Sequence, residues 1–175
     1  MNIQLRLMEE ADLTGVVAIE NRWSYLSKWG WAGFRSVLQN PWLYFNLVAE
    51  DLDYVGPTAC QPAEGENPED SSIKARPASP FLAGFAVLSM NPDHCELCDL
   101  VVLPEYLSLG VGQTLLNRCL DICRERKAAA LFLEVRHSNQ RAIHFYQKNG
   151  LQILSCRKAY YNNPAEDAWV MKKAL

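Results

Sequence analysis

The sequence contains no long apolar run. None of its 175 residues falls in a stretch that approaches the roughly 18 consecutive apolar residues of a membrane-spanning helix. The first residues also lack the basic-then-apolar order of a secretory signal peptide. We therefore expect a cytoplasmic protein that has no membrane partner.

An excess of positive charge is missing too. The 17 lysines and arginines are outnumbered by 20 aspartates and glutamates, and the formal net charge is −3. Such a chain has no overall basic field of the kind that draws proteins to nucleic acids, so we expect no direct nucleic-acid partner. Hydrophobic residues make up 49% of the sequence and charged residues 21%, which is typical of a soluble globular protein. At this length residues 1–175 are expected to form one domain with a full core, and nothing in the sequence argues against a monomer.

Cysteine sets that could bind a metal are scarce. Cys95 and Cys98 have C-x-x-C spacing, but the apolar residues around them predict a strand, in which positions i and i+3 face opposite sides and cannot share a metal. Cys119 and Cys123 share one face of an expected helix, where leucines surround them. We therefore expect reduced thiols, most of them buried, and no metal site.

The remaining pattern predicts alternating helices and strands around one insertion. Helices are expected at residues 9–22, within 22–40, at 111–127 and at 140–150. Strands are expected at residues 42–53, 80–90, 95–103, 129–136, 151–161 and 167–175. Residues 54–80, rich in proline and acidic in the middle, are predicted to be a mobile loop inserted in the hairpin of the first two strands. This order indicates an α/β or α+β sheet covered by helices.

One turn in this order has the chemistry of an anion site. In LPEYLSLGVGQTLL, residues 103–116, a strand-like run ends at a proline, and Gly110 and Gly112 open an apolar helix. The first N–H groups of a helix are unpaired and carry the positive end of its dipole, and glycine lets a phosphate approach them. A tight strand-to-helix connection explains the glycines equally well. A dinucleotide fingerprint and a P-loop are both excluded, because the third glycine and the G-K-[ST] sequence are missing after Gly112.

The turn resembles the acyl-CoA pyrophosphate loop, Q/R-x-x-G-x-G/A, of the GCN5-related N-acetyltransferases (the GNAT family), although Leu107 stands where Gln or Arg is usual. The resemblance continues through LFLEVRHSNQRAIHFYQKNGL and RKAYYNNPAEDAWVMKKAL, which are similar to the bacterial ribosomal-protein-alanine N-acetyltransferases of the RimI type. It covers essentially the whole chain outside residues 54–80. It implies a GNAT fold, with a mixed central sheet of about six to seven strands flanked by about four helices. Acetyl-CoA would lie where the sheet splays in the middle, and the acceptor would enter from the opposite side.

The resemblance also assigns roles to residues by position. Those matched to acetyl-CoA contacts are Leu100, Val101, Val102, Ser108, Leu109, Gly110, Val111, Gly112, Gln113 and Asn139. Glu134 matches the general base of the family and Tyr146 its general acid. Tyr160 and Tyr161 match tyrosines that line a peptide groove, and the loop around residues 23–31 would form the opposite wall.

Each role has a simpler structural alternative. Glu134 is a carboxylate in a strand that is apolar on both faces, so burial should raise its pKa toward that of a useful base, but Arg136 two residues on could pair with it instead. Tyr146 could be an ordinary core tyrosine, and Asn139 could be only the N-cap of the helix that follows. His137 and His144 each lie in a polar stretch and are expected at the surface.

Together these residues predict an enzyme that transfers acetyl from acetyl-CoA to a protein N-terminal α-amine, with the alanine of ribosomal small-subunit protein eighteen as the expected acceptor. An α-amine, with a pKa of about 8, is partly neutral at neutral pH, whereas a lysine amine is almost wholly charged. Two alternatives stay open. One is a GNAT enzyme that acetylates a small amine or another protein, and an acidic cluster in the acceptor groove would favour a polyamine. The other is a non-catalytic acyl-CoA binding module.

Overall fold

The computed structural model describes residues 1–24, 26, 28–54 and 81–175. The predicted loop at 54–80 lies outside the described residues except for Tyr54, and Cys60 lies outside them as well. Within the described parts, no helix is both long enough and apolar enough to cross a membrane.

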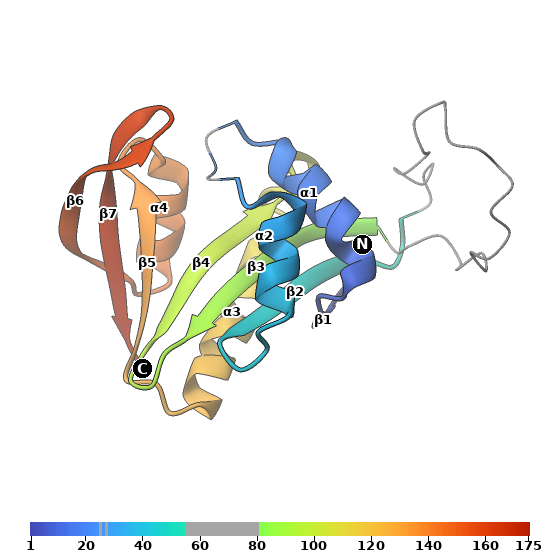
Figure 1. Ribbon diagram of the computed structural model, residues 1–175, viewed down its shortest axis with the longest axis horizontal. Coiled ribbons are helices and arrows are strands. Elements are labelled where there is room, and N and C mark those ends of the chain that lie inside the picture. Colours follow the sequence, from blue (N-terminus) through green and yellow to red (C-terminus); the bar gives the residue numbers. More distant parts are fainter. Residues whose placement is uncertain (25, 27, 55–80) are drawn as a thin grey trace, which may run out of the picture.

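Among the described residues, seven strands form one mixed sheet in the order β1-β2-β3-β4-β5-β7-β6 (Figure 1). The strands are β1 (Ile3–Leu7), β2 (Tyr44–Asp51), β3 (Phe81–Met90), β4 (Cys95–Val102), β5 (Ala130–Arg136), β6 (Gln152–Asn162) and β7 (Ala165–Ala174). All neighbouring strands are antiparallel except β4 and β5, which are parallel. The strands predicted from the sequence are confirmed, and β1 is a strand that the sequence pattern does not reveal.

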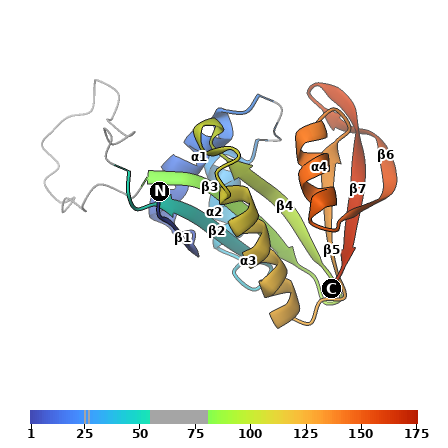
Figure 2. The same cartoon turned by 180° about the vertical axis from the view of Figure 1, so that it is seen from behind.

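Helices in the described ranges cover both faces of this sheet. They are α1 (Leu13–Asn21), α2 (Gly30–Leu38), α3 (Val111–Glu125) and α4 (Gln140–Lys148). The two opposite views show α1 and α2 on one face and α3 and α4 on the other (Figure 1 and Figure 2). Each helix lies where the sequence predicts one, so the expected layers of helix, sheet and helix are confirmed.

The core lies between the sheet and these helices. The buried residues of α3 recur at helical spacing and are Val111, Leu115, Leu116, Cys119, Leu120, Ile122 and Cys123. This apolar stripe is the reason that α3 packs one face against the sheet. Most of β2 and nearly all of β3 are buried, because helices cover both sides of the sheet there. By contrast, the edge strand β6 is exposed along most of its length.

The cysteines of β4 face opposite sides of the sheet, as their spacing predicts. Cys95 is buried and hydrogen-bonds with Cys123 of α3, whereas Cys98 lines a cavity on the other side. Burial raises the pKa of Cys119 to about 12, which keeps this thiol protonated. The thiols of the C-x-x-C pair therefore cannot reach one ligand together.

β4 and β5 separate soon after they begin. The pairing of β4 with β5 is limited to Cys95 with Leu131 and Glu96 with Phe132. By contrast, every residue of β5 pairs with β7. Beyond these two pairs the strands diverge, and the ribbon shows them apart (Figure 1). The predicted splay in the middle of the sheet is therefore confirmed.

Candidate functional site

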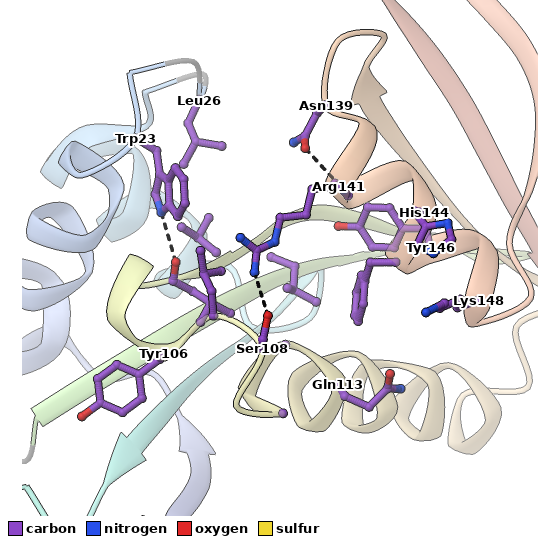
Figure 3. Close-up of a pocket in the computed structure, with 18 residues that line it drawn as sticks. Trp23, Leu26, Tyr106, Ser108, Gln113, Asn139, Arg141, His144, Tyr146 and Lys148 are labelled. Carbon is purple, nitrogen blue, oxygen red and sulfur yellow. Dashed lines mark hydrogen bonds between the residues drawn. The ribbon is translucent and has the colours of Figure 1, made fainter.

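Two cavities lie in the splay of the sheet. The larger cavity, of about 470 Å³, is lined by β4, the turn before α3, and α4 (Figure 3). The smaller cavity, of about 390 Å³, is lined by β4, β5, the start of α4 and the end of β6. Residues that line both cavities are Leu26, Leu100, Asn139, Ala142 and Tyr146. The two cavities therefore meet at this group of side chains.

The turn before α3 forms one end of the larger cavity. A short 3₁₀ turn, Pro104–Tyr106, ends β4, after which Ser108 and Gly110 both adopt left-handed backbone conformations, with φ of 64° and 91°. Gly110 is the N-cap of α3, and the first intrahelical hydrogen bond runs from the Thr114 N–H to the Gly110 carbonyl at 3.0 Å. The N–H groups of residues 111–113 precede that bond, so they have no partner within the helix. This end of the cavity therefore has the chemistry of an anion site.

Space for a ligand at this turn depends on Gly112. A Cβ atom built there would lie 3.6 Å from a Val102 methyl group, 3.7 Å from Leu100 and 3.9 Å from Phe145, all of which line the larger cavity. A side chain at 112 would therefore occupy the space between β4 and α4. At Gly110 a Cβ would meet nothing within 4 Å, so that glycine is required by its positive φ. The residues present fit the phosphate-bearing group that the sequence predicts here.

The residues matched to acetyl-CoA by position mostly gather at the larger cavity. Those that line it are Leu100, Val101, Val102, Ser108, Gly110, Gly112, Gln113 and Asn139. Leu109 points to solvent and Val111 is 1% exposed in the core, so neither side chain lies in the wall. The Gln113 amide donates to Asn149 Oδ1 at 2.6 Å, which ties α3 to the end of α4. The Gln113 side chain is thus engaged within the protein, which leaves its main-chain N–H as the group available to an anion.

The charged side chains of the larger cavity are all basic. Arg141 and Lys148 line it from α4, and no aspartate or glutamate belongs to the part of its wall that the structure describes. The Arg141 guanidinium donates from Nη2 to Ser108 Oγ at 3.1 Å, so it reaches from α4 to the turn before α3 (Figure 3). The sequence alone does not single out these two residues. Their helical spacing places both on one side of α4 with Phe145, but nothing in the sequence says that this side faces a cavity.

The smaller cavity is acidic, and a β-bulge helps to make it so. In the pairing of β3 with β4, Leu88 faces Leu97 and Val87 faces Asp99, so Cys98 is the extra residue. Because the bulge shifts the alternation by one position, Asp99 lies on the same side of β4 as Glu96. Both carboxylates line the smaller cavity, where Glu134 joins them from β5. A bulge of this kind has no signature in the sequence, so Asp99 was not expected here.

Glu134 is the carboxylate that β5 contributes to the smaller cavity. Its side chain is 12% exposed and its Oε1 lies 3.0 Å from Arg157 Nη1. Burial, the largest cause, and then a hydrogen bond and the charge of Glu96 raise the pKa of Glu134 to about 6, while Arg157 lowers it. The expected desolvation of this carboxylate is confirmed.

The alternative in which Arg136 pairs with Glu134 is wrong. Arg136 instead contacts Glu166 at 3.2 Å and donates to the carbonyls of Asn163 and Pro164 at 2.9 and 3.0 Å. Its guanidinium also lies 4.0 Å from the ring centre of Tyr161. Arg136 is thus held by the turn between β6 and β7 and by Glu166, and it does not pair with Glu134.

Tyr146 of α4 stands where the two cavities meet. It is buried, as a core tyrosine would be, yet it lines both cavities. Burial, followed by the charge of Asp99, raises the pKa of its phenol, so the hydroxyl keeps its proton at neutral pH. Tyr146 is therefore a buried proton donor at the junction of the two cavities, where it could protonate a group that leaves a bound substrate.

Asn139 is the N-cap of α4, as one of the two readings of the sequence predicts. Its Oδ1 accepts the Ala142 N–H at 3.1 Å. The same side chain lines both cavities, so the cap fixes the amide at their junction. The two roles considered for Asn139 are therefore compatible.

Aromatic residues form the remaining walls of the smaller cavity. Tyr160 and Tyr161 pack edge to face with ring centres 5.1 Å apart at the end of β6. Trp29 lines the cavity from the loop before α2, and Trp23 of the same connection donates from Nε1 to the Val102 carbonyl at 3.1 Å. The tyrosine pair and Trp29 of the first loop therefore line the same cavity.

Asp99 is the other strongly perturbed carboxyl of the smaller cavity. Burial, and then the charge of Glu20, raise the pKa of Asp99 to about 7, whereas a hydrogen bond with Trp29 and the charge of Lys28 lower it.

His137 is exposed, as predicted, and so is His144, although its side chain reaches the wall of the larger cavity. In the described ranges no group of three or more His, Cys, Asp or Glu side chains could hold a metal ion.

Comparisons with known proteins agree with this geometry. The model of the acetyltransferase (GNAT) family matches residues 30–151. A Bacillus subtilis protein described as a candidate ribosomal protein bS18-alanine N-acetyltransferase is 30% identical over 137 residues, which cover 72% of this chain and 91% of that protein. The streptothricin acetyltransferase of Streptomyces lavendulae is 35% identical over 107 residues, which cover 60% of this chain and 57% of that protein. The crystal structure of the Escherichia coli ribosomal-protein-S18-alanine N-acetyltransferase superposes with a TM-score of 0.75 at 25% identity, covering 99% of this chain and 94% of that one.

Proposed function

The chain belongs to the GNAT acetyltransferase family and is an acetyl-CoA-dependent N-acetyltransferase, and from this premise we propose that its acceptor is a protein N-terminal α-amine. The N-terminal alanine of a small-subunit ribosomal protein is the specific acceptor that we infer. Support for it comes from the Bacillus subtilis relative, since the matched region spans most of both chains.

The observation that carries the proposal is the opposite charge of the two cavities that meet at Tyr146. The larger cavity has Arg141 and Lys148 in its wall and N–H groups at its turn, which suit the phosphates of a coenzyme. The smaller cavity has three carboxylates, which suit an ammonium group, and the one arginine in its described wall, Arg136, is paired with Glu166. Donor and acceptor would therefore approach Tyr146 from opposite sides.

Glu134 is the proposed general base. Acetyl-CoA, when bound, supplies the acetyl group and leaves as the thiol. An N-terminal ammonium group must lose a proton before it can attack, and Glu134 accepts that proton, directly or through one water molecule. With a pKa of about 6, its carboxylate is mostly ionised at neutral pH and is still a stronger base than an ordinary glutamate.

Tyr146 is the proposed general acid. It holds a proton at its phenol oxygen, and burial keeps that proton in place. A thiolate is a better leaving group when it receives a proton as it departs, and Tyr146 is the buried donor at the junction of the cavities. After turnover the phenol regains a proton from solvent or from the acceptor side.

A peptide would enter between Tyr160 and Tyr161 on one side and Trp29 on the other. These rings can hold the first residues of a chain by packing while leaving its backbone free to hydrogen-bond. Glu134 lines the same cavity, so a terminal amine that enters it would lie near the proposed base.

A small polycationic amine is the second candidate acceptor. Acidic residues in the acceptor groove were the feature expected of a polyamine enzyme, and Glu96, Asp99 and Glu134 all line the smaller cavity. The relative named streptothricin acetyltransferase adds weight to this candidate. The aromatic walls suit either acceptor, because rings pack against a peptide and their faces also attract an ammonium group. The Bacillus subtilis relative is the observation that favours the peptide.

A panel of acceptors tests the proposal. The protein is incubated with acetyl-CoA and with peptides that begin with Ala, Ser or Met, and separately with spermidine, and products are identified by mass spectrometry. Acetylation of the peptide beginning with Ala is expected. Transfer to spermidine alone would support the second candidate, and no transfer despite tight CoA binding would indicate a non-catalytic binding module.

A further inference from the structure

The turn before α3 offers an anion no positively charged side chain of its own. The N–H groups of residues 111–113 provide neutral donors, and Leu107 contributes only an apolar side chain to the wall. A coenzyme pyrophosphate carries two negative charges, and neutral donors alone bind such a group less strongly than donors with a positive charge. A cation from another element of the structure would therefore strengthen the binding of this group.

Arg141 is a basic side chain that contacts this turn directly. It is the second residue of α4, and its guanidinium crosses the cavity to donate to Ser108 Oγ at 3.1 Å (Figure 3). Ser108 has a left-handed backbone, with φ of 64°, and this conformation belongs to the turn that exposes the N–H groups. The side chain of α4 and the backbone of the turn thus face the same space.

No acid competes for this arginine within the cavity. The described wall has no aspartate or glutamate, and the hydroxyl of Ser108 is a neutral acceptor. Several other described arginines form ion pairs, as Arg124 does with Asp121 at 2.9 Å and Arg22 with Glu105 at 2.6 Å. A guanidinium held by one neutral hydrogen bond can move to a phosphate at little cost, because it does not have to break an ion pair.

We propose that Arg141 binds the pyrophosphate of acetyl-CoA from the α4 side, opposite the N–H groups of the α3 turn, and so supplies the positive charge that Leu107 does not. The planar guanidinium can donate two parallel hydrogen bonds to phosphate oxygens. Ser108 positions it for this contact. Lys148 lies seven residues further along α4, about 10 Å away along the helix axis, so it faces a different part of the ligand.

This inference rests on the use of acetyl-CoA in the proposed function and not on the choice of acceptor. Binding is therefore measured by titration calorimetry without any acceptor, using CoA, dephospho-CoA, which lacks the 3′-phosphate, and pantetheine, which lacks every phosphate. A failure to acetylate peptides would leave these measurements unaffected. The two proposals can thus fail separately.

Arg141→Gln is expected to weaken the binding of CoA and of dephospho-CoA by the same factor, about 10- to 100-fold, with pantetheine unchanged. Arg124→Gln, which removes the same charge from the exposed face of α3, is the matched control and should change none of the three. Thermal unfolding of each variant shows whether the fold is retained. In the Arg141→Gln background, Leu107→Arg should restore most of the lost affinity, because it places a guanidinium on the other side of the same turn.

Three results would overturn the proposal. A loss for CoA but not for dephospho-CoA would assign Arg141 to the 3′-phosphate. An equal loss for pantetheine would mean that the substitution disturbs the cavity rather than a phosphate contact. Unchanged affinity for all three ligands would remove Arg141 from coenzyme binding altogether.

Discussion

Glu134 of β5 and Arg157 of β6 form an ion pair at 3.0 Å. Strand β7 lies between β5 and β6 in the sheet, so this pair spans β7. Glu96 approaches the same carboxylate from β4. The base is thus held between a cation that lowers its pKa and an acid that raises it, and burial raises it further. This arrangement makes the acidity of Glu134 adjustable from either side.

The pH dependence of turnover should reflect this balance. Glu134 works as a base only when ionised, so kcat/KM should fall as the pH drops through about 6, the pKa of the group. Arg157→Gln removes the charge that lowers this pKa, so the acid limb should move to higher pH. Glu96→Gln removes the charge that raises it, so the limb should move to lower pH. A wild-type limb near the ordinary glutamate value, unmoved by either change, would contradict the account.

Removal of the base should separate catalysis from binding. Glu134→Gln is expected to lower kcat by about 10²- to 10⁴-fold. The CoA affinity measured by calorimetry should stay the same, because Glu134 lines only the smaller cavity. Glu125→Gln, an exposed acid of α3 paired with Arg118, serves as the control for the loss of one charge. An unchanged kcat in Glu134→Gln would exclude this residue from the mechanism.

Removal of the proposed acid should act on the departure of the thiol. Tyr146→Phe keeps the ring in the core and removes only the hydroxyl, so the melting temperature should change little and kcat should fall by about 10²-fold or more. Acetyl donors whose thiols have a lower pKa need less help from an acid and should lose less rate in the variant. Tyr44→Phe, on β2 away from both cavities, is the matched control. If donors of different thiol pKa lose the same rate, Tyr146 does not protonate the leaving group.

Asn139 can be tested for its two roles at once. Asn139→Ala removes the cap of α4 and should lower the free energy of unfolding by about 1 kcal/mol. Asn139→Ser keeps a capping oxygen, so stability should be close to that of the wild type. Because serine lacks the amide at the junction of the cavities, CoA binding should weaken in both variants. Wild-type affinity in Asn139→Ser would mean that Asn139 is a cap and nothing more.

Much of the fold can be predicted because local patterns agree with it. The apolar stripe of α3 and the branched, apolar runs of β2 and β3 each identify an element without tertiary information. β1 is missed because its five residues, Ile3–Leu7, are too few for a clear pattern and are fixed mainly by their pairing with β2.

The parts of the site that the sequence does not reveal depend on long-range geometry. Arg136 was a reasonable partner for Glu134 by spacing, but the turn after β6 binds it, and Arg157 takes its place. Asp99 reaches the acceptor cavity only because of the bulge at Cys98. Burial, bulges and contacts between distant strands determine where Asp99 and Arg157 lie, and local sequence patterns do not predict any of these features.

The most direct test of the central claim is the position of the acetyl group on a single peptide. A peptide that begins with Ala and contains one internal lysine is incubated with acetyl-CoA and the protein, and tandem mass spectrometry locates the added group. The account predicts acetylation at the α-amine of Ala, lost in Glu134→Gln and retained in Glu125→Gln. Acetyl on the lysine side chain alone, or on neither amine, would contradict it.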